Sequence, residues 1–118
     1  MTTTTAIDPT ALVTAIQNRD SSALAASYAP DAVISIVDHD HPPASPQVLS
    51  GRAEIEAYYR DVCGRNLDHA VPTIVSTDTV LAFEQNCRYP DGVTVTCVTV
   101  ASVFDGLITR QTIVQAWD

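Results

Sequence analysis

The 118-residue chain is 46% hydrophobic and 17% charged, a balance typical of a folded globular protein. Its formal net charge of −8 argues against nucleic acid and anionic membrane surfaces as partners, because both select clustered basic side chains. All six basic residues are arginines, so no lysine amine is available for Schiff-base chemistry. At this length we expect a single domain over residues 1–118 with a hydrophobic core of its own.

Cysteine usage and the N-terminus indicate a compartment. Cys63, Cys87 and Cys97 are odd in number and lack CxxC spacing, which favours a reducing environment over a disulfide framework or a zinc site. The opening MTTTTA has neither the basic nor the apolar region of a signal peptide. We therefore expect a cytoplasmic protein. We also expect no metal and no organic cofactor, and we expect residues 1–7 to form a frayed tail.

The first half of the chain alternates helical and irregular patterns. Asp8-Pro9 starts a predicted helix over 8–18, because Asp caps helices well and Pro suits their first position. A second helix is predicted over 20–29, ended by Pro30. An apolar strand over 31–37, a loop over 38–50 and a helix over 51–64 follow. A loop of that length in a small domain is often a lid or a site wall.

The second half reads as strands, predicted over 69–77, 79–89, 93–104 and 107–117. Asp91-Gly92 and Asp105-Gly106 mark two hairpin turns, because Gly supplies the positive φ that such turns need. A phase shift in the apolar pattern near Thr96-Cys97 suggests a β-bulge. Strands this long twist and curl. The order of elements predicts an α+β fold, a curved antiparallel sheet with three helices closing its concave face over an internal cavity.

Three segments carry a resemblance to a known family: YAPDAVI at 28–34, LSGRAEIEAYY at 49–59 and VFDGLI at 103–108. Together with the element order, they make the chain similar to the nuclear-transport-factor-2-like superfamily, and within it to SnoaL-like polyketide cyclases and ketosteroid isomerases. The resemblance implies a cone of curved sheet around an apolar cavity. It also implies a homodimer, because many members pair through the outer face of the sheet.

The isomerase members of the family use a carboxylate base, a tyrosine and a carboxylic acid. By position, the resemblance places the base at Ile36, the tyrosine at Leu12 and the acid at Val100, so all three polar groups are missing here. The two supporting aromatic positions match, as Tyr28 and Tyr59. A register shifted by a residue or two would bring Asp38 to the position of the base.

The segment Asp38-His39-Asp40-His41 is the densest ionisable cluster. A His beside carboxylates at a cavity mouth can act as a general base, and two His at i, i+2 can also chelate a metal. A solvated polar loop explains the segment equally simply. His69 opens a predicted strand and either points into the cavity or serves a structural role.

The cavity wall is predicted from strand periodicity. Alternation places Phe83, Gln85 and Cys87 on one face, and Gln111, Ile113 and Gln115 on one face of the last strand. If those faces are concave, the amides orient a ligand's oxygens; if the register is reversed, they face solvent or a partner. Tyr58 and Tyr59 are adjacent on a helix, so only one of them is expected to line the cavity. Cys87 has no basic neighbour on its own face of the strand, which argues against an activated thiolate.

Two functions are consistent with these features. The first is a cofactor-free proton-transfer enzyme, an isomerase, cyclase or dehydratase, acting on a hydrophobic carbonyl compound with His39, Asp38 or His69 as the catalytic group. The second is a non-catalytic module that binds a hydrophobic small molecule or dimerises. The position of an ionisable side chain relative to the cavity distinguishes the two.

Overall fold

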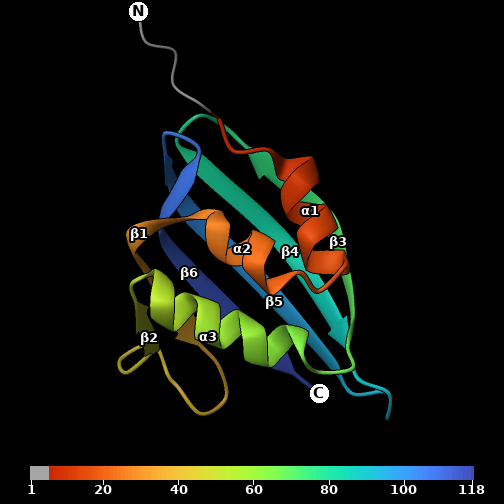
Figure 1. Cartoon of the computed structure of the whole chain (residues 1–118). Helices are drawn as coiled ribbons and strands as arrows, with labels where there is room; N and C mark the ends of the chain where they lie inside the picture. The colour runs from red at the N-terminus through yellow and green to blue at the C-terminus, as the bar shows by residue number, and fades with distance from the viewer. Residues whose placement is uncertain (1–5) are drawn as a thin grey trace, which may run out of the picture.

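Six strands form one curved, unclosed sheet, and three helices cover one of its faces (Figure 1). A computed structural model describes residues 6–118 of the chain. The described elements, in chain order, are α1 Pro9–Gln17, α2 Ser21–Ala26, β1 Tyr28–Val37, β2 Gln47–Ser50, α3 Arg52–Cys63, β3 Asp68–Ser76, β4 Val80–Arg88, β5 Thr94–Phe104 and β6 Leu107–Trp117. The α+β class predicted from the sequence is confirmed.

The strand order is β2-β1-β6-β5-β4-β3, so the chain's last strand lies at the centre of the sheet. Neighbouring strands are antiparallel except for β1 and β6, which pair in parallel. This pair departs from the expected antiparallel sheet. Since β2, α3 and three strands separate β1 from β6, no hairpin constrains their relative direction.

The hairpin turns were predicted correctly. Asp105 and Gly106 both have positive φ, 51° and 77°, as a type I′ turn requires, and Gly92 has φ 94° in the preceding turn. The predicted helix starts also hold. Asp8 Oδ1 accepts from the backbone N–H of Thr10 at 3.0 Å and of Ala11 at 3.2 Å. These bonds satisfy two N–H groups that have no partner within the helix.

Two boundaries differ from the sequence prediction. The second helix ends at Ala26, and β1 begins at Tyr28, before Pro30. Pro30 is tolerated there because the β1–β6 register shifts between Tyr28 and Val33, so no ladder bond is required of it. The sequence predicted a frayed tail over residues 1–7. Residues 1–5 lie outside the described part of the chain, and Ile7 is buried in the core.

The predicted loop 38–50 contains a short strand, β2, which pairs antiparallel with β1. Only four residues long, β2 is too short for period-two alternation to reveal it. Gly51 then starts α3 with φ 87°, and its N–H donates to Ala32 O at 2.8 Å. That bond fixes the start of α3 against β1.

The strand β5 alternates without interruption between an inward and an outward face. No bulge occurs near Thr96-Cys97; the register shift lies between Ser102 and Val103, against β6. Thr99 therefore points inward with 2% exposure, and Val100 points outward with 57%. The placement of Val100 in the cavity wall was thus wrong by one residue.

The outer face of the sheet exposes apolar side chains. Val98 on β5 is paired in register with Val114 on β6, and both are about half exposed.

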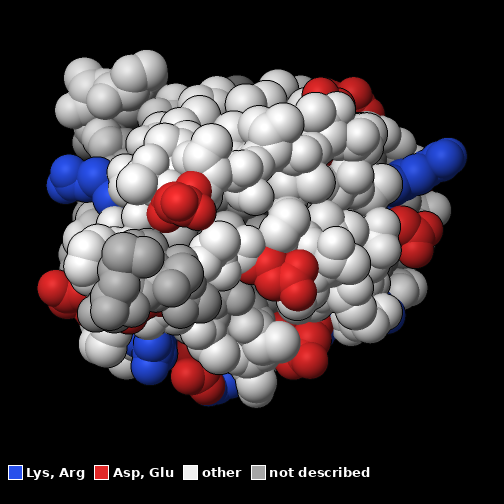
Figure 2. Space-filling view, turned by 90° about the horizontal axis from the view of Figure 1, so that it is seen from above, with Lys and Arg blue, Asp and Glu red and all other residues white. Residues whose placement is uncertain are grey.

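Figure 2 shows another side of the molecule, seen from above, where acidic side chains are spaced apart and basic ones lie at the rim. Among residues 6–118, no helix has the length and hydropathy needed to cross a membrane.

We predict that Ile55→Ala lowers the free energy of unfolding by about 2–5 kcal/mol. Ile55 is fully buried on α3, which packs against β1 and β2, so truncation leaves a void that this packing cannot refill. Urea unfolding followed by circular dichroism measures the effect. Val75→Ala is the control, because Val75 is 63% exposed and should change stability little. Equal losses in both variants would contradict the assigned core.

Candidate functional site

A cavity of about 190 Å³ lies between the inner face of the sheet and the helices. From β1, the residue after it and α3, it is lined by Tyr28, Ile36, Asp38, Tyr58 and Tyr59. From the other strands, it is lined by His69, Phe83, Gln85, Cys87, Gln111, Ile113 and Gln115. The sequence had proposed all of these residues as site residues.

Both tyrosines of α3 line the cavity, although only one was expected to. Their rings meet edge to face with centroids 5.3 Å apart. Tyr59 also contacts the ring of Tyr28, with centroids 5.8 Å apart. Successive side chains on a helix point about 100° apart, and the cavity is wide enough to take both rings. The expectation considered the helix positions alone and not the width of the cavity.

His39 does not line the cavity. Its side chain is 88% exposed, and its Nδ1 lies 3.1 Å from Asp40 Oδ1. Backbone bonds between Asp38 and His41, in both directions, close a tight turn whose tip is residues 39–40. This turn directs the histidine at its tip to solvent, so the expected catalytic role of His39 has no support from its position.

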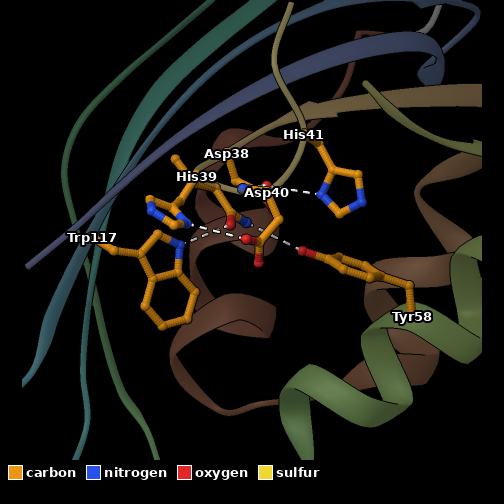
Figure 3. Close-up of polar contacts among 7 residues, drawn as sticks. Asp38, His39, Asp40, His41, Tyr58 and Trp117 are labelled. Carbon is orange, nitrogen blue, oxygen red and sulfur yellow. Dashed lines mark hydrogen bonds and ion pairs between the residues drawn. The ribbon is translucent and has the colours of Figure 1, made fainter. Parts of the chain in front are cut away.

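Asp38 stands at the mouth of the cavity, directly after β1. Its Oδ1 accepts from Asp40 N at 2.9 Å and lies 2.8 Å from His41 Nδ1 (Figure 3). Burial acts to raise the pKa of this carboxyl group, but the bonds from His41 and from Asp40 N–H outweigh it and lower the pKa below the usual value. Asp38 is therefore a carboxylate at neutral pH.

The phenol of Tyr58, on α3, lies near the same mouth of the cavity. Gln115 Nε2 donates to Tyr58 Oη at 3.4 Å, and Trp117 Nε1 donates to Gln115 Oε1 at 3.3 Å (Figure 3). Since the phenol oxygen accepts this bond, its O–H proton can be offered to a ligand. Burial raises the pKa of Tyr58 to about 12, so the phenol keeps that proton at neutral pH.

A buried chain of hydrogen bonds crosses the inner part of the cavity. Tyr28 Oη donates to Gln111 Oε1 and lies 2.6 Å from Tyr59 Oη, which can donate to it. Gln111 Nε2 donates to Thr99 Oγ1 at 3.4 Å. Burial raises the pKa of both phenols in this chain. Gln111 is 2% exposed and bonded at both ends of its amide, so it holds the wall rather than a ligand.

A third polar cluster lies where β3, β4 and β5 meet. His69 and Cys87 are register partners, and His69 Nδ1 lies 3.2 Å from Cys87 Sγ. Gln85 Nε2 lies 3.1 Å from the same nitrogen and 3.4 Å from the sulfur. Cys87 thus has a basic neighbour, contrary to the sequence prediction. The prediction considered one strand alone, and the neighbour comes from the paired strand.

Sequence reasoning missed several wall residues, among them Thr99, Cys97 and Trp117. Simple period-two alternation along β5 would have turned Cys97 and Thr99 inward, but the assumed bulge concealed it. Trp117 had no such signal. Within residues 6–118, no group of three or more His, Cys, Asp or Glu side chains is placed to hold a metal ion.

Comparisons with known proteins place this geometry in context. The family model of the SnoaL-like domain matches residues 10–111. No curated protein sequence matches the chain. An NTF2-like protein of unknown function from Mesorhizobium loti superposes with a TM-score of 0.77 at 17% identity, covering 89% of this chain and 84% of the other.

Two similar structures have names that suggest activities. A protein proposed to be a ketosteroid isomerase, from Kribbella flavida, has a TM-score of 0.74 at 19% identity, covering 91% of this chain and 73% of the other. IdmH, proposed to be a polyketide cyclase, from Streptomyces antibioticus, has a TM-score of 0.65 at 23% identity, covering 90% and 87%. At these identities the likeness shows the fold alone.

We predict that Gln111→Leu lowers the free energy of unfolding by about 1–3 kcal/mol, because it removes the acceptor of Tyr28 and the donor to Thr99. Chemical denaturation measures the loss. Gln115→Leu is the matched control, since Gln115 is only half-buried and bonds at the cavity mouth. If the two variants lose the same stability, Gln111 is not the structural amide of the site.

Proposed function

The chain belongs to the family of SnoaL-like domains, and we propose that it catalyses a cofactor-free proton transfer on a small, largely apolar carbonyl compound. The observation that carries the proposal is the position of Asp38, a carboxylate directly after β1 at the wall of an apolar cavity. This is the end of the strand at which the family's isomerases carry their base. The names of the similar structures, an isomerase and a cyclase, are consistent with the proposal.

Asp38 would remove a proton from the carbon next to the carbonyl group. Tyr58 would donate its O–H to the carbonyl oxygen, where negative charge grows as the proton leaves. The bond from Gln115 keeps the phenol oriented toward the mouth. With a β,γ-unsaturated ketone, the proton then returns from Asp38 to the far carbon of the dienolate, giving the conjugated isomer. With a dicarbonyl compound, the enolate carbon attacks the second carbonyl group and the proton from Asp38 goes to the new alkoxide, giving a ring. A positioned general base contributes about 10²–10⁴-fold to such a step.

The size and lining of the cavity restrict the substrate. At about 190 Å³ the cavity is smaller than the roughly 300–1,000 Å³ of common ligand sites. More than half of the lining residues are aliphatic or aromatic. These features favour a compact carbonyl compound over one as large as a steroid.

We predict that Asp38→Asn abolishes proton transfer and leaves binding within about threefold, because an amide keeps the shape of the carboxylate but cannot accept the proton. A thermal-shift screen of small cyclic ketones and polyketide-like diketones selects the ligand. Mass spectrometry then measures deuterium uptake from D₂O into the bound compound. His39→Ala is the control and should exchange normally, since that side chain faces solvent.

Undiminished exchange in Asp38→Asn would remove Asp38 from the mechanism. The second candidate function, a binding module without chemistry, is favoured because Leu12, Ile36 and the inward-facing Thr99 place no ionisable group at the three isomerase positions. It predicts tight binding with no deuterium uptake by the unchanged protein. The same two measurements therefore separate both candidates.

We also propose that the protein forms a homodimer through the outer face of β5 and β6. Val98, Val100 and Val114 expose apolar surface side by side on these two strands. A second copy of the same face would remove that surface from water.

We predict that Val98→Asp shifts the protein from dimer to monomer, because it places a carboxylate in the centre of the proposed interface. Sedimentation velocity at micromolar concentration measures the change. Val75→Asp, on edge strand β3 and equally exposed to water, should leave the dimer intact. A monomer in the unchanged protein would contradict the interface.

A further inference from the structure

The polar cluster of β3–β5 is not used by the proton transfer proposed above. It consists of Cys87 with His69, Gln85 and Cys97, all of which line the cavity. The Cys87 thiol is 7% exposed, so the cavity is its route to a ligand. A thiol with an imidazole in contact is the arrangement of a nucleophile with its base.

We propose that Cys87 is a second reactive centre of the cavity, whose sulfur adds to the β-carbon of an α,β-unsaturated carbonyl compound with His69 as the proton carrier. This goes beyond the proton transfer at Asp38 and does not depend on it. The class of ligand follows from the chemistry of the wall, because a soft thiolate in an apolar cavity suits a soft, apolar electrophile.

Side chains from three strands surround the sulfur. His69 Nδ1 lies 3.2 Å from it on β3, and Gln85 Nε2 donates to it at 3.4 Å from β4. Cys97 on β5 is the register partner of Gln85, so its thiol lies on the same inner face as Cys87. Donors to a thiolate stabilise the charged form, as donors to an oxyanion do.

The balance of these interactions favours the thiolate. The S–H of Cys97, followed by His69 and Gln85, lowers the pKa of Cys87 to about 5, although burial alone would raise it. The pKa of Cys97 rises correspondingly, so this thiol keeps its proton and remains a donor. The titratable groups that interact with Cys87 are His69 on β3, Cys97 on β5 and Tyr58 on α3.

The addition balances without any oxidant. Cys87 passes its proton to His69 Nδ1, and the thiolate forms a C–S bond at the β-carbon. The π electrons of the C=C bond move toward the carbonyl group and give an enolate. The imidazolium of His69 then returns the proton to the α-carbon, so the product is a thioether that contains every atom of thiol and enone.

Magnitudes predict how the rate depends on pH. At pH 6 a thiol with a pKa of about 5 holds roughly 300-fold more thiolate than one with a pKa of about 8.5. Its lower basicity reduces intrinsic nucleophilicity by about 25- to 60-fold. The net advantage at pH 6 is about five- to tenfold. Above pH 6 the rate should be nearly flat, because the thiolate is already fully formed.

The test is incubation of the whole protein with 2-cyclohexen-1-one in a thiol-free phosphine reductant, at pH 6 and at pH 8. Intact mass and peptide mapping identify the modified cysteine. Cys63 is the internal control, because burial raises its pKa and its rate should increase steeply with pH. We expect one adduct, on Cys87, forming at nearly equal rates at the two pH values, and none in Cys87→Ser.

The variant His69→Gln tests the proton carrier. We expect it to slow the addition at pH 6 by up to about tenfold and to make the rate rise more with pH than in the unchanged protein, because Cys97 and Gln85 still lower the pKa of Cys87. Far-ultraviolet circular dichroism verifies that the variant is folded. The proposal would be overturned if Cys63 is modified before Cys87 or if Cys87 stays unmodified. An unchanged rate of addition in His69→Gln would also overturn it. Intact mass detects the thioether without any deuterium-exchange measurement. A failure of this proposal can therefore be distinguished from a failure of the proton transfer proposed at Asp38.

Discussion

The buried hydrogen-bond chain from Tyr59 through Tyr28 and Gln111 to Thr99 holds the cavity together. It connects α3 to β1, β6 and β5. Tyr28, Gln111 and Thr99 are buried and Tyr59 is partly buried, so a missing partner would leave a polar atom without water. The need to keep these hydrogen bonds fixes the distance between α3 and the sheet. At this distance the cavity stays open.

The two reactive groups, Asp38 and Cys87, are not part of this hydrogen-bond chain. Asp38 follows the end of β1, where the backbone turns back and donates an N–H to the carboxylate. Cys87 lies on the opposite half of the sheet, where register pairing brings His69 beside it. The two groups come from different strands, so one apolar cavity can hold two different chemistries.

Much of this arrangement follows from local sequence. The hairpin turns, the helix caps and the inward faces of β4 and β6 are local properties that periodicity and turn chemistry reveal. The parallel pairing of β1 with β6 and the pairing of edge strand β2 depend on contacts between segments that no turn motif connects. The direction of His39 follows from a tight turn between Asp38 and His41 that the sequence pattern did not reveal. A single strand read alone also cannot show its lateral neighbours, which is why the imidazole beside Cys87 was missed.

The position of the carboxylate decides what chemistry the site can support. A base in a dry interior has a raised pKa, whereas Asp38 receives hydrogen bonds at the mouth that lower its pKa and weaken it as a base. A weak base can remove only an acidic proton, such as one between two carbonyl groups or one beside a carbonyl bonded to Tyr58. The interior isomerase positions hold no carboxyl group, and the carboxylate lies at the mouth; both point to the same substrate, a compact and readily enolised carbonyl compound.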